Sequence, residues 1–216
     1  MNLIGEDLYQ FSTYIPAINL TFNQYLLLTE EPILFHTGNI HQAKALVPQL
    51  KEVLGEKELK YIFASHFEAD ECGGLSIILD AYSSAVTICS EVTARELNGF
   101  GINSEVLIKK PGEILNTDSF KLEFISYPSE VHLWEGILAI EDTRGIFFSS
   151  DLMITRGDSR GLSKNSDWLK EIENVNSMQI PNPEQLILLQ EQLKRFNPTL
   201  IATGHGSVVN LRSDIV

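Results

Sequence analysis

The chain has 216 residues, of which 44% are hydrophobic and 21% are charged, and its formal net charge at pH 7 is −13. This length and composition describe a globular protein with one large domain or two small ones. The acidic charge, which no local cluster of Lys and Arg offsets, disfavours nucleic acid and anionic lipid as partners.

The amino terminus and the cysteines bear on the compartment. The opening segment, MNLIGEDLYQF, lacks the basic and apolar regions of a signal peptide. No apolar run approaches the roughly 18 residues needed to span a bilayer. The two cysteines, Cys72 and Cys89, suit a reducing compartment. We therefore expect a cytoplasmic protein with no membrane partner.

Strand and helix patterns alternate in the first half of the chain. Gly55 gives a stop signal after a stretch with helical spacing, and Ser90 is a suitable cap for another helix. The predicted elements are strands over residues 22–30, 32–36, 59–66 and 85–90, and helices over residues 41–55, 74–82 and 90–100.

The second half begins with short strands and contains one long helix, for which Asn182 is a natural cap. Its predicted elements are strands over residues 105–110, 120–126, 135–142, 145–151 and 199–206, and a helix over residues 183–196. Two strand-rich halves, each interrupted by helices, favour two packed sheets with helices outside them, an αββα sandwich.

Potential metal ligands are concentrated in SHFEADECGG, residues 65–74. Three further polar residues follow strand-like segments: His132, Asp151 and His205. Each taken alone has an ordinary explanation, such as a solvated acidic loop, a capped turn or a histidine in a tight turn. Together they predict a metal site, because loops at strand ends are where a rigid scaffold holds functional groups.

This pattern resembles the metallo-β-lactamase superfamily. The superfamily motif is His-x-His-x-Asp-His, and its flavodiiron branch has His-x-Glu-x-Asp-His, whereas residues 66–71 here read His-x-Glu-x-Asp-Glu. The segments HLW, FFSSD and TGHG resemble the branch's later ligand segments and follow in the same order. The resemblance covers essentially the whole chain. It implies one α/β (α+β) domain over residues 1–216, folded as a four-layer αββα sandwich.

The resemblance also implies two metal ions held by seven side chains. One metal takes His66, Glu68 and His132, and the second takes Asp70, Glu71 and His205. Asp151 bridges the two. Glu71 departs from the branch, which has histidine there. His36 stands where the superfamily has the aspartate of an Asp-Thr-Gly segment, and we expect it to form a hydrogen bond behind the site or to pack in the core.

The ligand types favour iron. Two histidines and one carboxylate suit non-haem ferrous iron, and replacing the imidazoles of zinc hydrolases by carboxylates stabilises ferric iron. The carboxylates of Glu68, Asp70, Glu71 and Asp151, with one negative charge each, balance two ferrous ions. We therefore expect two iron ions bridged by an oxo, hydroxo or peroxo group, with zinc or manganese as alternatives.

By resemblance, such a domain binds O₂ or NO and reduces it when electrons are supplied. Three interpretations stay open: an oxygen sensor or store, a flavodiiron-type reductase fed by a separate rubredoxin or flavoprotein, and a hydrolase of thioesters, lactones or phosphodiesters. Flavodiiron proteins carry a flavodoxin-like domain after this one, whereas this sequence ends at Val216, so we expect no flavin in this chain. A signalling partner and a homodimer are both compatible with the sequence.

Overall fold

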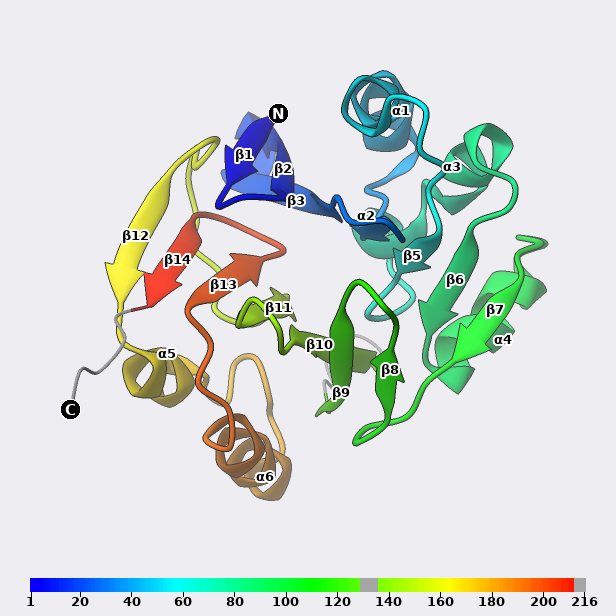
Figure 1. Cartoon of the computed structure of the whole chain (residues 1–216). Helices are drawn as coiled ribbons and strands as arrows, with labels where there is room; N and C mark the ends of the chain where they lie inside the picture. The colour runs from blue at the N-terminus through cyan, green and yellow to red at the C-terminus, as the bar shows by residue number, and fades with distance from the viewer. Residues whose placement is uncertain (129–135, 212–216) are drawn as a thin grey trace.

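The computed structural model describes residues 1–128 and 136–211. Their strands form two seven-stranded sheets (Figure 1). In spatial order, the first sheet contains β1 (Asn2–Ile4), β2 (Leu8–Ile15), β3 (Leu20–Leu27), β4 (Ile33–Phe35), β5 (Tyr61–Phe63), β6 (Val86–Cys89) and β7 (Val106–Ile108). The second contains β12 (Ser163–Ser166), β14 (Val208–Leu211), β13 (Leu200–Thr203), β11 (Ile146–Ser150), β10 (Gly136–Glu141), β9 (Lys121–Tyr127) and β8 (Ile114–Asn116).

Helices cover the outer face of each sheet (Figure 1). The first sheet is covered by α1 (Ile40–Leu54), α3 (Leu75–Ala81) and α4 (Glu91–Gly99), and the second by α5 (Trp168–Asn174) and α6 (Pro183–Leu193). Two short helices, η1 (Pro16–Ile18) and α2 (Ala69–Cys72), lie in connections. The predicted four-layer αββα sandwich is therefore confirmed.

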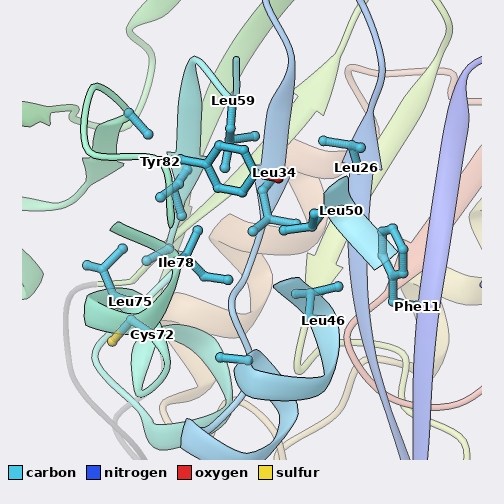
Figure 2. Packing of buried hydrophobic residues seen from close by; sticks show 14 of the residues in the cluster. Phe11, Leu26, Leu34, Leu46, Leu50, Leu59, Cys72, Leu75, Ile78 and Tyr82 are labelled. Carbon is cyan, nitrogen blue, oxygen red and sulfur yellow. The ribbon is translucent and has the colours of Figure 1, made fainter. Parts of the chain in front are cut away.

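Three apolar clusters separate the four layers. Between the first sheet and its helices, Leu46 and Leu50 of α1 and Ile78 of α3 pack with Leu26 and Leu34 (Figure 2). A second cluster fills the space between the sheets, where the rings of Phe35 and Phe148 stack with centroids 3.4 Å apart. A third lies between the second sheet and α5 and α6. Buried apolar side chains of this kind each stabilise the fold by about 1.5–3 kcal/mol.

Local signals explain where α1 begins and ends. The Asn39 side chain accepts hydrogen bonds from the backbone N–H groups of His41 and Gln42, and the Gln42 side chain accepts one from the backbone of Asn39, which completes a capping box. Gly55 follows the last turn with a positive φ of 59°, a conformation that costs glycine little. Both ends agree with the sequence pattern.

Several predicted strands end earlier than the pattern indicated. The strand predicted to reach residue 66 ends at Phe63, and the strand predicted to reach residue 206 ends at Thr203. In both cases the chain leaves the sheet before the histidine that follows. The sequence analysis also missed β1, β2, β8, β12, β14 and α5. In residues 1–128 and 136–211, no helix is both long and apolar enough to cross a membrane.

Candidate metal centre

Three loops bring the expected ligands together. The segment after β5 carries His66, Glu68 and Asp70, the turn after β11 carries Asp151, and the loop after β13 carries His205. Among the described residues, two groups could each hold a metal ion. They are His66 with Glu68 and Asp151, and Asp70 with Asp151 and His205. The ligand atoms within each group lie within 4.8 Å of one another.

Asp151 belongs to both groups, and its two carboxylate oxygens face different histidines. Oδ1 lies 2.9 Å from His205 Nε2, and Oδ2 lies 3.4 Å from His66 Nε2. Glu68 completes one side at 3.0 Å from His66 Nε2, and Asp70 completes the other at 3.2 Å from His205 Nε2. Asp151 therefore has the geometry of a bridging ligand.

The turn that carries Asp151 has an uncommon backbone. Ser150 and Met153, on either side of it, have positive φ values of 47° and 61°, a region that side-chain-bearing residues rarely occupy. The N–H of Leu152 donates to the carbonyl of Ser149 at 2.9 Å, and the Ser149 hydroxyl donates to the carbonyl of Leu152 at 2.9 Å. These bonds hold Asp151, which is 7% exposed, at the end of its strand.

Gly204 sets the distance between the Asp151 turn and the His205 loop. Its N–H donates to the carbonyl of Ser150 at 2.9 Å, and a Cβ at this position would stand 2.7 Å from that carbonyl oxygen. The backbones of two ligand loops therefore meet at a position that has no room for a side chain.

We expect Gly204→Ala to separate these loops, lowering the free energy of unfolding by about 1–3 kcal/mol and weakening metal binding. Urea unfolding and metal titration of the variant check this. Gly99→Ala is the matched control, because nothing lies within 4 Å of a Cβ there. Equal behaviour of the two variants would contradict the role of Gly204.

The His205 loop is also fastened to β3. The Asn23 side-chain amide donates to the carbonyls of Thr203 at 3.0 Å and Gly206 at 2.8 Å. The backbone N–H of Asn23 donates to the carbonyl of Gly204 at 2.9 Å. The ring of Phe22 meets the His205 ring edge-on, with centroids 4.7 Å apart. Contacts from the first sheet thus orient a side chain that belongs to the second.

The neighbouring carboxylates raise the pKa of both histidines. Burial alone lowers the pKa of His66, but its hydrogen bond to Glu68 and the charges of Glu71 and Asp151 outweigh burial and raise that pKa to about 9. Burial likewise lowers the pKa of His205, and its bonds to Asp151 and Asp70 outweigh burial and raise it to about 10. Without metal, both rings are therefore cationic at neutral pH and partly offset the carboxylate charge.

Glu71 is near this centre but belongs to neither group of candidate ligands. Its buried carboxylate instead accepts from Ser65 Oγ at 3.3 Å and Ser150 Oγ at 3.0 Å, and it forms an ion pair with His36. The structure therefore places His36 behind the site in an ion pair with a buried carboxylate, where the sequence indicated a hydrogen bond or packing in the core. The sequence analysis did not assign Ser65 and Ser150 to this position, although each directly precedes an expected ligand.

One expected ligand lies outside the described residues. His132, expected to bind the first metal, falls in residues 129–135. His41 lies in the first turn of α1 and is exposed.

Comparison with known proteins identifies the family. Residues 20–206 match the family described as ODP family beta lactamase. The chain belongs to this family. The resemblance to the flavodiiron branch is borne out as well, because relatives and structural neighbours of this ODP family member carry flavodiiron and diflavin flavoprotein names.

One relative is the putative diflavin flavoprotein A 2 of Nostoc sp., which is 21% identical over 91% of this chain and 35% of its own length. The chain thus spans about a third of the length of the curated relatives it matches. A variant of the Thermotoga maritima flavo di-iron protein superposes with a TM-score of 0.72 at 23% identity, covering 88% of this chain and 50% of that one. The Desulfovibrio gigas rubredoxin oxygen:oxidoreductase gives 0.77 at 18%, covering 94% and 56%. At these identities the structures establish the fold.

The donor set of this ODP family member fits metal ions. Carboxylate oxygens and imidazole nitrogens from separate loops converge within hydrogen-bond range, with the Nε2 atom of each ring directed at carboxylates. Carboxylates held this close repel one another and need compensating positive charge, which divalent metal ions would supply. Carboxylate-rich sites with one or two imidazoles suit iron or manganese, whereas structural zinc prefers thiolate and imidazole.

Proposed function

We propose that this chain is a dinuclear non-haem iron domain that binds O₂ or NO. His66, Glu68 and His132 hold one ion, Asp70 and His205 hold the other, and Asp151 bridges them. The observation that carries the proposal is the division of the two Asp151 oxygens between His66 and His205. Glu71, expected as a seventh ligand, belongs to neither group of candidate ligands.

Two iron ions held by these residues would supply two electrons for the reduction of a bound diatomic molecule. The protein groups bind and orient the ions, and their carboxylates favour the oxidised state. His66, Asp151 and His205 are each less than 9% exposed, so these three side chains have little contact with water. Glu68, whose side chain is 39% exposed, marks the side of the site nearest to solvent.

Turnover requires electrons from a donor, which we propose to be a separate rubredoxin or flavoprotein. The names of the relatives, which include a rubredoxin oxygen:oxidoreductase and diflavin flavoproteins, support this proposal. Without a donor the same site acts as an oxygen-binding or sensing domain. We propose a reducing, cytoplasmic setting, which suits the two free and buried cysteines, Cys72 and Cys89.

An anaerobic metal analysis followed by an optical spectrum on adding air tests the proposal. We expect two iron ions per chain and a new charge-transfer absorption on exposure to O₂ or NO. Addition of a reduced rubredoxin or flavoprotein then separates a reductase, which consumes O₂ repeatedly, from a domain that only binds it. Zinc or manganese with no response to oxygen would overturn the proposal, and thioesters, lactones and phosphodiesters would then be the substrates to screen.

A further inference from the structure

We infer that Glu71 stays outside the metal coordination and is a positioning residue, which holds His66 in its metal-binding orientation through Ser65 and Ser150. This inference rests on the proposed metal site. It gives a role to the one residue at which the motif of this chain departs from the flavodiiron pattern.

A chain of hydrogen bonds connects the His66 ring to the Glu71 carboxylate. Ser65 Oγ lies 2.8 Å from His66 Nδ1 and 2.7 Å from Ser150 Oγ, and the Ser150 hydroxyl donates to Glu71 Oε1 at 3.0 Å. Because a carboxylate only accepts, the donors run in one direction, from His66 Nδ1–H to Ser65, from Ser65 to Ser150 and from Ser150 to Glu71. Ser65 Oγ also lies 3.3 Å from Glu71 Oε2 and can donate there instead.

The direction of these hydrogen bonds fixes the tautomer of the His66 ring, with its proton on Nδ1, that metal binding requires. With its proton kept on Nδ1, His66 would present the Nε2 lone pair to a metal ion, and Nε2 is the atom that faces Glu68 and Asp151. Histidines that bind metals usually donate their other N–H to a carboxylate, a carbonyl or water, which fixes the tautomer and the orientation of the ring. Here two hydroxyls extend that link to a carboxylate.

Both carboxylate oxygens of Glu71 already have partners, which favour its present orientation over one that faces a metal. Oε1 accepts from Ser150, and Oε2 meets Nε2 of His36. Glu71 and His36 are 2% and 4% exposed, so a Glu71 that turned away would leave a buried imidazole without its partner, at a cost of about 1–3 kcal/mol.

The backbone on both sides keeps the pair in place. His36 has a φ of 64°, an uncommon conformation for a residue with a side chain, and its N–H donates to the carbonyl of Phe63 at 2.8 Å. The N–H of Thr37 donates to the carbonyl of Glu71 at 2.8 Å. The sequence is consistent with this arrangement. Positions 36 and 71 depart together from aspartate and histidine to histidine and glutamate, which preserves a carboxylate–imidazole pair.

The inference changes the expected charge of the site. Three carboxylates, those of Glu68, Asp70 and Asp151, then face the two ions in place of four. Asp70, Asp151 and His205 would hold the second ion without Glu71, which would leave room for an exogenous anion or diatomic molecule as a further ligand.

Titration of the chelator-treated full chain with Zn²⁺ and with Co²⁺ tests the inference in Glu71→Gln, Ser65→Ala and the double variant. We expect all three to retain two ions per chain, with affinity at the His66 site lowered about 10–100-fold. Because both substitutions interrupt one chain of bonds, the double variant should lose no more than the worse single one. In the zinc-loaded protein, ¹⁵N spectra should show that the His66 Nδ1–H signal is displaced in each variant.

Glu141→Gln is the matched control, since Glu141 is also a buried glutamate but bonds the backbone of the β10–β11 turn; its metal affinity and His66 signal should equal those of the unaltered chain. If Glu71→Gln fails to fold, Ser65→Ala carries the same test, because both routes from His66 to Glu71 pass through Ser65 Oγ and the carboxylate stays in place.

Two results would overturn the inference alone: Glu71→Gln binding a single ion, which makes Glu71 a ligand, or unchanged affinity and an unchanged Nδ1 signal, which removes its effect on His66. Failure of the unaltered chain to bind Zn²⁺ or Co²⁺ would instead remove the proposed metal site and the inference with it.

Discussion

Replacing Asp151 by asparagine is expected to abolish the binding of both metal ions. Metal affinity should fall more than about 100-fold at each site, because loss of a residue that only supports a metal ligand already costs about 10–100-fold. Each carboxylate oxygen faces a different histidine, Oδ1 toward His205 and Oδ2 toward His66. The substitution removes the charge that both ions share and leaves one side with an amide nitrogen, which cannot bind a cation. Metal content by mass spectrometry after equilibrium dialysis measures the loss.

Asp142→Asn is the control for this experiment. Asp142 lies in the turn between β10 and β11, the strand that precedes Asp151, and its half-exposed carboxylate pairs with Lys121 at 2.7 Å. Its removal should leave two ions per chain, because an exposed ion pair contributes only about 0–1 kcal/mol. An Asp151→Asn protein that still bound two ions would refute the bridging role, and one that lost a single ion would assign Asp151 to that ion alone.

The layers of the fold could be predicted from the sequence because they depend on strong local patterns. The helix α1 has a capping box at Asn39 and a glycine at its end, and the buried strands β10 and β11 read as apolar runs. The edge elements could not be predicted as well. Strand β12, SKNS, has no apolar residue and exists because it pairs in parallel with β14, a contact that arises only in the folded chain.

The candidate site shows the same division between local and distant information. Its ligand types were visible because His66, Glu68 and Asp70 lie close together in the sequence. The contacts of Glu71 were not visible, because they come from Ser150 and His36, residues 79 and 35 positions away. In the sequence, a carboxylate next to candidate ligands is interpreted as a further ligand. In three dimensions its oxygens are occupied by donors from β11 and from the segment after β4.

Metal removal is expected to reverse the dependence of stability on pH. In the metal-free chain the neighbouring carboxylates raise the pKa of His66 to about 9 and that of His205 to about 10, whereas an unfolded histidine has a pKa of about 6.5. The folded state therefore binds more protons than the unfolded state between these values. The stabilisation is fully present below about pH 6.5 and is lost as the pH rises through 9 and 10, by about 1–3 kcal/mol per pH unit at its steepest.

The metal-loaded chain should show no such loss. Each ion takes the Nε2 position that a proton occupies in the metal-free state, so binding releases protons and grows stronger as the pH rises. Urea unfolding of chelator-treated and loaded protein at pH 6.5, 8 and 9.5 should give curves that diverge toward high pH. In the metal-free His205→Gln variant the slope should flatten, while His41→Gln, at an exposed position, should leave it unchanged. A metal-free protein whose stability rose over this range would bind fewer protons folded than unfolded, which would contradict the raised histidine pKa values.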